Sequence, residues 1–213
     1  MTRLELPYRR ASPGDALELA ELINMAGEGM PLYLWEGMAE AGETVWDVGR
    51  RRARREEGSF SYRNAIVREE DGRAVATLIG YPLAEEPPPW DPAALPAMFV
   101  PLQELEDLAP GTWYVNVLAS YPQCRGKGYG NELLSIAEAQ AVASGCKGLS
   151  VIVSDGNHGA LRLYERTGYE RVASRAIVKD DWENPGENWL LLTKFRSSER
   201  NRGPRGPLHV GLE

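Results

Sequence analysis

A glycine-rich turn between a strand pattern and a helix pattern constrains this chain more than any other feature. Residues 125–130 read Arg-Gly-Lys-Gly-Tyr-Gly and follow 113–119, a run rich in β-branched and aromatic residues that predicts a strand. Apolar residues at helical spacing follow over 131–143. Such a turn aims several backbone N–H groups and the positive end of a helix dipole at one place. The pattern therefore predicts a site for a phosphate or a pyrophosphate.

Three kinds of cofactor site contain a turn of this type, and two of them do not fit these residues. A dinucleotide fold requires Gly-x-Gly-x-x-Gly, whereas the glycines here stand at 126, 128 and 130. A P-loop ends in Gly-Lys-Ser/Thr, but Gly128 follows Lys127. An acyl-CoA site remains, beside the simpler alternative of a helix-initiating turn that binds nothing.

A second motif further along the chain favours the acyl-CoA alternative. Residues 157–169 read Asn-His-Gly-Ala-Leu-Arg-Leu-Tyr-Glu-Arg-Thr-Gly-Tyr and follow an apolar run over 149–154 that predicts a buried strand. Asn157 is suited to cap the start of a helix and Gly168 to end it. A helix that carries Tyr164 on its apolar face is therefore expected between them.

Together the two motifs resemble the GNAT superfamily of acyl-CoA-dependent N-acyltransferases. The family pattern Arg/Gln-x-x-Gly-x-Gly/Ala matches 125–130, and Asn-x-x-Ala-x-x-x-Tyr-x-x-x-Gly-Phe/Tyr matches 157–169 at every marked position. The run 116–122 also resembles the family's fourth strand, so the resemblance is specific over 112–170 and topological elsewhere. It implies an α/β fold whose mixed, mostly antiparallel central sheet is flanked by helices and splayed between strands four and five. It also implies an enzyme that transfers an acetyl group from acetyl-CoA to a primary amine.

The resemblance implies where the cofactor would bind. Its pyrophosphate would lie on the backbone of the turn, with Arg125 and Lys127 adding positive charge, although surface charge would also explain these two side chains. The pantetheine arm would pair with the open edge of the strand that precedes the turn. The cofactor-binding residues so implied are Val117, Leu118, Ala119, Ser120, Arg125, Gly126, Lys127, Gly128, Tyr129, Gly130, Asn157 and Tyr164.

Three of these residues are also candidates for catalysis by direct attack in a ternary complex. The phenol of Tyr164 is a neutral donor at pH 7 and would protonate the departing CoA thiolate. The N–H of Leu118 would polarise the thioester carbonyl. Asn157 would cap its helix and bond the pantetheine amide. The alternatives are a core tyrosine, an asparagine that only caps, and a non-catalytic acyl-CoA-binding domain with this fold.

The sequence leaves the general base and the acceptor open. The candidate bases are Glu28, Glu36, Glu104, Glu106 and Asp107, each of which could equally be a solvated surface group. Asn116 is polar within an apolar strand, so it either lines the acceptor pocket or bonds a bulged backbone. Five tryptophans either wall an aromatic acceptor pocket or hold loops to the core. They are Trp35, Trp46, Trp90, Trp113 and Trp182. The acceptor is a small-molecule or peptide amine, and carboxylates with aromatics favour a cationic one.

Composition narrows the class of protein. A chain of 213 residues with 43% hydrophobic content can bury one core, and it has no run of 18 apolar residues. The first residues do not read as a signal peptide, so we expect a cytoplasmic protein with no membrane partner. The net charge of −7 argues against nucleic-acid binding, and two histidines and two unclustered cysteines argue against a metal site. The basic run 50–55 predicts a salt-bridged helix face or a docking patch.

The remaining chain predicts one α/β domain over 1–196 and a polar tail over 197–213. Strands are expected over 4–8, 62–68, 73–81, 171–178 and 189–195, and helices after the Ser12–Asp15 cap and over 43–56. The segment 27–42 is glycine-rich, and the proline-rich segment that begins with 85–92 and has further prolines at 96 and 101 is expected as an extended surface excursion within the domain. The terminal strands or the tail could form a homodimer, as is common in the family that the chain resembles.

Overall fold

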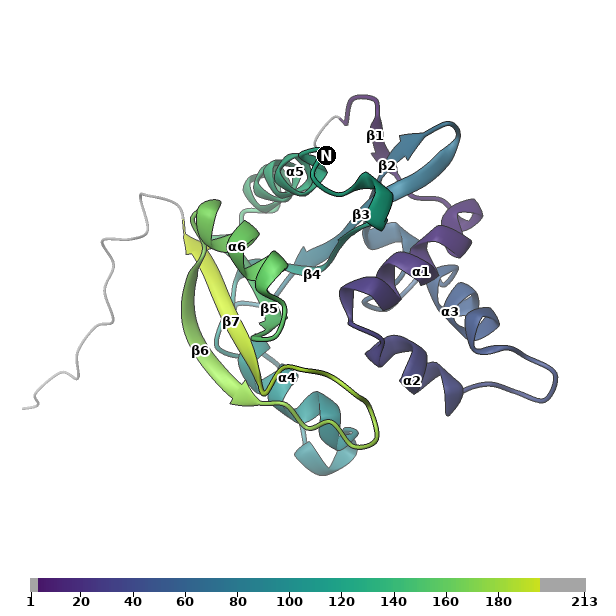
Figure 1. Ribbon diagram of the computed structural model, residues 1–213. Coiled ribbons are helices and arrows are strands. Elements are labelled where there is room, and N and C mark those ends of the chain that lie inside the picture. The colour runs from purple at the N-terminus through teal and green to yellow at the C-terminus, as the bar shows by residue number, and fades with distance from the viewer. Residues whose placement is uncertain (1–3, 196–213) are drawn as a thin grey trace, which may run out of the picture.

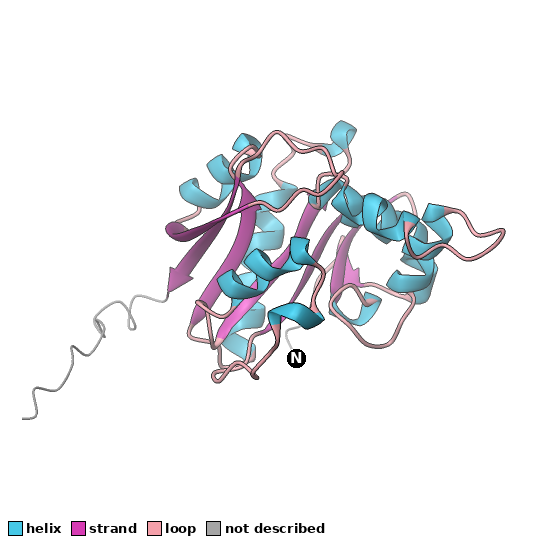
Figure 2. Cartoon of the chain, turned by 90° about the horizontal axis from the view of Figure 1, so that it is seen from below, coloured by secondary structure: helices cyan, strands magenta, loops and turns pink. Residues whose placement is uncertain are grey.

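The computed structural model describes residues 4–195. They form one seven-stranded sheet with helices on both faces (Figures 1 and 2). The expected tail over 197–213 lies outside the described residues. The strands are β1 (Tyr8–Arg10), β2 (Ala65–Glu70), β3 (Arg73–Pro82), β4 (Thr112–Ser120), β5 (Gly148–Ser154), β6 (Glu170–Ala176) and β7 (Asn188–Phe195). The α-helices are α1 (Ala16–Ala26), α2 (Met30–Glu36), α3 (Val45–Ala53), α4 (Val100–Glu106), α5 (Tyr129–Ala143) and α6 (His158–Arg166).

The strand order is β1-β2-β3-β4-β5-β7-β6, and every neighbouring pair is antiparallel except β4 with β5. Helices α5 and α6 cover one face of the sheet, where their apolar residues form a core with β3, β4 and β5. On the other face, α1 and α3 pack on β2 and β3, while α4 packs beside β7. The mixed, mostly antiparallel sheet expected above is confirmed.

The parallel pair β4–β5 is short, and the two strands then part. Only Thr112–Val115 pairs with β5, and beyond it Asn116 forms a bulge, because on β3 Ile79 pairs with Val117 while Gly80 pairs with Val115. A Cβ on Gly80 would lie 2.1 Å from the Trp113 ring, so glycine is required at the bulge. The expected splay between the fourth and fifth strands is confirmed.

Side-chain caps start the helices that the sequence predicts. The Ser12 and Asp15 side chains form a capping box ahead of α1, and Thr44 with Asp47 forms another ahead of α3. Asn157 Oδ1 accepts a hydrogen bond of 3.1 Å from the N–H of Ala160 at the start of α6.

Several elements differ from the expectation. The first strand covers Tyr8–Arg10 instead of 4–8, and β2 begins at Ala65 because a 3₁₀ turn occupies Tyr62–Asn64. Helix α2 lies within the glycine-rich segment, where Gly29 adopts φ +88° just before it. The proline-rich segment expected as a surface excursion leads into α4, which contains its last proline, Pro101, and whose Leu105 is fully buried.

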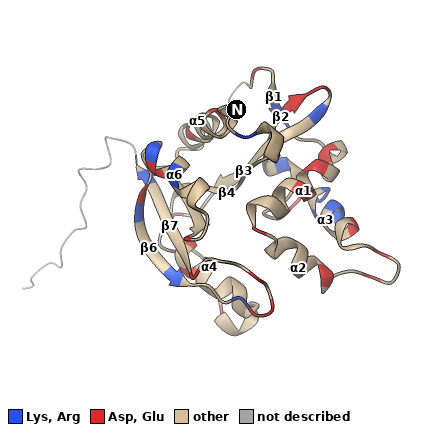
Figure 3. Cartoon of the chain, in the orientation of Figure 1, with Lys and Arg blue, Asp and Glu red and all other residues tan. Residues whose placement is uncertain are grey.

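The arginine-rich run forms the salt-bridged helix face that its charge pattern predicts. Arg50 lies 2.5 Å from Asp47 and Arg51 lies 2.9 Å from Glu43, so the acidic partners precede the run (Figure 3). Across residues 4–195, none of the helices has the length and apolar character needed to cross a bilayer.

Candidate active site

A cavity of about 730 Å³ lies where β4 and β5 part. One half is lined by β4 beyond the bulge, the turn before α5 and the first turns of α6. The other half is lined by the connection between α1 and α2, by α4 and the segment before it, and by Tyr81 and Tyr114. We name these the cofactor half and the acceptor half, after the roles that their chemistry favours below.

The glycine turn gives the cofactor half its anion-binding character. Gly126 and Gly128 adopt φ +76° and +91°, and Gly128 is the N-cap of α5. Among the described residues the N–H groups of Tyr129 and Gly130 have no backbone acceptor, so they remain available to a ligand, whereas that of Asn131 donates to Gly128 O at 3.0 Å. Glycine is needed at position 130 for a different reason, because a Cβ there would lie 2.9 Å from Cδ2 of Leu163 on α6.

Side chains of β2 contact Tyr129 and Lys127 of the glycine turn. The Tyr129 hydroxyl donates a hydrogen bond to Glu70, and the Arg68 guanidinium lies 3.8 Å from the centre of the Tyr129 ring. Lys127 also turns toward this group, with its Nζ 3.8 Å from Glu70, and it does not line the cavity, whereas Arg125 does. The sequence reasoning missed Arg68 and Glu70, because charged residues near a hairpin turn have the pattern of solvated surface.

The bulge leaves one edge of β4 open to the gap. Tyr121 N–H donates to Val75 O at 3.1 Å, so Tyr121 and Val75 form a hydrogen-bonded pair of the antiparallel ladder between β4 and β3. Hydrogen-bonded and non-hydrogen-bonded pairs alternate along an antiparallel ladder, so the Leu118–Leu78 pair is of the second kind. The N–H and C=O of Leu118 therefore face the gap and not β3.

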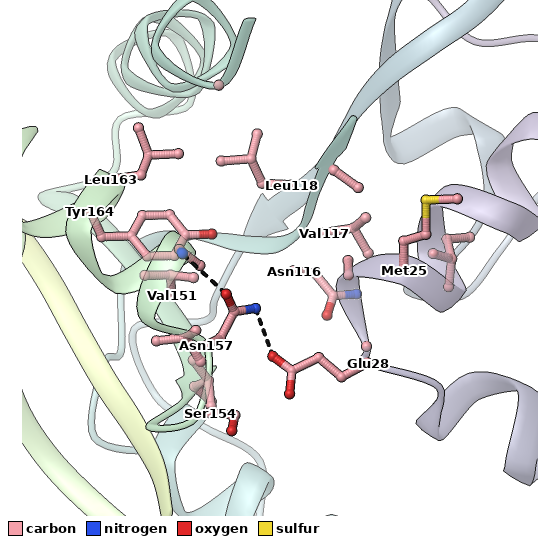
Figure 4. A pocket seen from close by; sticks show the side chains of 18 of the residues that line it. Met25, Glu28, Asn116, Val117, Leu118, Val151, Ser154, Asn157, Leu163 and Tyr164 are labelled. Atoms are coloured by element: carbon pink, nitrogen blue, oxygen red, sulfur yellow. Dashed lines mark hydrogen bonds between the residues drawn. The ribbon is translucent and has the colours of Figure 1, made fainter. Parts of the chain in front are cut away.

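Tyr164 enters the same gap from α6. Its side chain is buried, its ring packs 5.4 Å from that of Tyr169, and its hydroxyl points toward Leu118 (Figure 4). Burial raises the pKa of Tyr164 above its ordinary value of 10.0, so the phenol stays protonated at neutral pH. A proton donor is therefore held beside an open strand edge.

The Asn157 side chain makes two hydrogen bonds to described residues, and only one of them is the expected cap. Its Nδ2 donates to Glu28 Oε1 at 2.6 Å (Figure 4), and Asn184 Nδ2 donates to Glu28 Oε2, also at 2.6 Å. The Glu28 carboxylate thus joins α6, the connection between α1 and α2, and the loop before β7. No feature of the sequence pointed to Asn184.

Two of the five candidate bases, Glu28 and Glu106, line the cavity. Burial, with the Asp107 carboxylate as a second cause, raises the pKa of Glu106 to about 7. Glu104 instead pairs with Arg175 at 2.5 Å, and Asp107 accepts hydrogen bonds from Trp90 and Gln103. Glu36 is exposed at a separate, smaller cavity.

Asn116 lines the cavity at the bulge itself. Its Nδ2 is buried without a hydrogen-bond partner among the described residues, so the side chain does not bond the bulged backbone through this group. Figure 4 shows the amide directed into the space beside Glu28. Asn116 therefore lines the cavity, and its contact with an acceptor stays a prediction.

The aromatic wall consists of residues other than those expected. None of the five tryptophans named from the sequence lines this cavity. Trp35 packs against Gly49, and Trp182 stacks on Trp189 with 6.0 Å between ring centres, so these two hold loops and helices to the core. The rings that line the cavity are Phe60, Tyr81, Phe99, Tyr114, Tyr129, Tyr164 and Trp189.

In this structure two central strands separate next to the N-terminus of a helix that is suited to bind an anion. This arrangement is typical of α/β proteins that bind a long cofactor in the gap between two strands of the sheet. Comparison with known proteins identifies the family within that class. The chain belongs to the acetyltransferase (GNAT) family, whose family model matches residues 32–169. This confirms the family to which the two motifs pointed.

Individual relatives agree with this assignment. An acetyltransferase of Yersinia enterocolitica is 36% identical over 70 residues, which is 30% of this chain and 50% of that protein. The chain thus spans about half the length of the curated relatives it matches. Among solved structures, an acetyltransferase superposes with a TM-score of 0.61 at 23% identity over 88% of this chain and 98% of its own. An N-acetyltransferase from Staphylococcus aureus gives 0.61 at 20% identity over 88% and 99%.

Proposed function

We propose that this protein is an N-acetyltransferase that moves an acetyl group from acetyl-CoA to a primary amine within a ternary complex. The observation that carries the proposal is the continuity of one cavity from the glycine turn, past Leu118 and Tyr164, to Glu106. Membership of the acetyltransferase family and the names of the relatives support it.

The cofactor half suits coenzyme A. The pyrophosphate would sit on the N–H groups around Gly128, with Arg125 adding charge. The pantetheine amides would pair with the open edge of β4 over Val117–Ser120, as an added strand does. The thioester would then reach the space between Leu118 and Tyr164.

The reaction needs a neutral amine, a stabilised oxyanion and a protonated leaving group. Glu106 accepts a proton from the substrate ammonium, directly or through water, and its pKa near 7 suits that role at neutral pH. The amine nitrogen attacks the thioester carbon while the Leu118 N–H stabilises the oxyanion, an interaction of roughly 3 kcal/mol in comparable sites. The C–S bond then breaks, the thiolate takes the proton of Tyr164, and the acetylated nitrogen gives up its second proton, which restores the phenol directly or through water.

Two measurements test the proposal. Calorimetry with acetyl-CoA tests the cofactor half, and release of free CoA thiol that depends on an added amine tests the transfer. Binding without amine-dependent thiol release would support a non-catalytic acyl-CoA-binding domain instead. No heat with any coenzyme A species would refute both. Sedimentation of the purified protein tests the proposed homodimer separately.

A further inference from the structure

The acceptor half of the cavity is largely apolar. It is formed by the end of α1 and the start of α2, by residues 59–60, and by α4 with the segment before it. Its apolar and aromatic lining residues are Ile23, Met25, Met30, Phe60, Tyr81, Leu95, Phe99, Leu102, Tyr114 and Trp189. A substrate that fills this half gains most from an apolar body, because burial of apolar surface is the main favourable contribution available there.

The charges that line the cavity are segregated. The two carboxylates, Glu28 and Glu106, lie in the acceptor half, and the two cations, Arg125 and Arg166, lie on the turn and on α6 in the cofactor half. A carboxylate on the acceptor would therefore be buried beside like charge and without a counter-ion. Both conditions oppose binding. An ammonium group, in contrast, meets acceptors of the right charge.

The acceptor half is bordered at one edge, at its lining residue Glu28, by contacts between two segments of the chain. The Trp182 indole N–H donates to the backbone carbonyl of Glu28 at 3.2 Å, and the Tyr33 hydroxyl donates to Asp180 at 3.0 Å. Together with the bond from Asn184 to Glu28, these contacts join the loop before β7 to α2 and to the connection that precedes it (Figure 1). A polypeptide that extended past this edge would have to break them.

From these three observations we infer that the acceptor is a small primary amine with an apolar body and no carboxylate, enclosed beneath the joined loops. The inference rests on the proposed function and narrows its acceptor. It sets aside polyamines, whose several charges would enter an apolar space, as well as free amino acids and protein N-termini.

A matched series of amines tests the chemical class. With acetyl-CoA saturating, 2-phenylethylamine should be acetylated with a kcat/KM at least about 100-fold above that of phenylalanine, which adds only a carboxylate. It should also exceed spermidine and the peptide Phe-Ala-Ala. Equal or better use of phenylalanine, spermidine or the peptide would overturn the inference while leaving the acetyltransferase proposal intact.

The same series, titrated calorimetrically into enzyme loaded with CoA, separates the two proposals. If no amine is acetylated but 2-phenylethylamine binds in preference to the others, the inference about the cavity holds and the proposed activity fails. If 2-phenylethylamine does not bind, the inference fails as well.

One substitution tests the closed edge. Asn184→Asp keeps the Oδ1 that accepts from Gly186 N–H at 2.7 Å but sets a carboxylate against that of Glu28, which should part the loops. We expect kcat/KM for Phe-Ala-Ala to rise about tenfold relative to that for 2-phenylethylamine. The control Asn188→Asp makes the same charge change beside Asp155, which does not line the cavity, and should leave the ratio unchanged. An unchanged ratio in a folded Asn184→Asp protein would contradict the closed edge.

Discussion

Asn157 donates a hydrogen bond of 2.6 Å to Glu28, a residue 129 positions away in the sequence. The bond fixes the N-terminus of α6, the helix that carries Tyr164, against the connection between α1 and α2. The wall of the acceptor half is thereby held in place relative to the proposed acid. A residue that the sequence assigned to capping and cofactor binding thus also sets the geometry between the two halves of the cavity.

Tyr164→Phe should lower kcat by roughly 100-fold, because it removes the proposed donor to the thiolate. The dissociation constant of acetyl-CoA should stay within about twofold, since the ring is kept. Tyr169→Phe is the matched control, because it removes a neighbouring buried hydroxyl that has no hydrogen-bond partner among the described residues. Steady-state kinetics and calorimetry measure both. Equal effects of the two variants would show that Tyr164 is only a core residue.

Glu106→Gln should lower kcat/KM by about 100-fold near neutral pH and abolish one limb of the pH profile. In the wild type, kcat/KM should rise with pH as Glu106 ionises, with an apparent pKa about 7. Glu104→Gln, on the outer side of the same helix, should keep that limb. A limb near pH 7 that persists in Glu106→Gln would exclude this residue as the base.

The same substitution should change the pH dependence of stability. Burial raises the pKa of Glu106 in the folded protein, so the unfolded chain gives up this proton at lower pH than the folded one. The wild type therefore loses stability as pH rises from about 4.5 to about 7, and the loss is complete above that range. Thermal melts should show that the Tm of Glu106→Gln rises relative to that of the wild type as the pH increases across this window. A constant difference would contradict the raised pKa.

Gly126→Ala should weaken acetyl-CoA binding at least about tenfold, because an added Cβ would project from the turn where the pyrophosphate would lie. Gly145→Ala, at the other end of α5, is a close control. The two glycines have φ of +76° and +73°, and neither Cβ would meet an atom within 4 Å, so both substitutions cost the same backbone strain. Melting temperature should fall equally in both, while calorimetry detects weaker binding only in Gly126→Ala. Equal binding would place the cofactor elsewhere.

Gly80→Ala should destabilise the protein by about 3 kcal/mol, because the new Cβ would overlap the Trp113 ring and the Tyr114 carbonyl at the bulge. Gly37→Ala serves as the comparison, since Gly37 has φ −71° and its Cβ would meet nothing closer than 3.7 Å. That variant should be neutral or slightly stabilised. Urea denaturation gives both free energies, and a mild effect of Gly80→Ala would mean that the bulge tolerates a Cβ.

The local elements of the site could be predicted because their signals are local. The turn at Gly128, the cap at Asn157 and the helix that carries Tyr164 each depend on residues a few positions apart. The identity of the aromatic wall could not be predicted. Phe99 and Trp189 enter the acceptor half from distant segments, and a tryptophan such as Trp35 reads the same in sequence whether it packs in the core or lines a cavity.

Helix α4 and the choice among the carboxylates show a second limit. Prolines mark the segment before α4 as irregular, yet Pro101 stands in the first turn, where a helix tolerates it. Glu104 and Glu106 are two residues apart, so they lie on different sides of one helix. Which side meets the cavity depends on how α4 packs beside β7, which no local pattern records.

The sequence by itself determined the family, the order of the strands and helices around the two motifs, and the backbone donors of the turn. The family follows from the resemblance of the two motifs to a known pattern, and the other two follow from steric and hydrogen-bonding preferences of adjacent residues. The tertiary structure alone decided which carboxylates line the cavity, which rings form the acceptor wall and which segments meet beside it. Those properties depend on desolvation and on contacts between segments far apart in the chain, and both exist only once the sheet and its helices have packed.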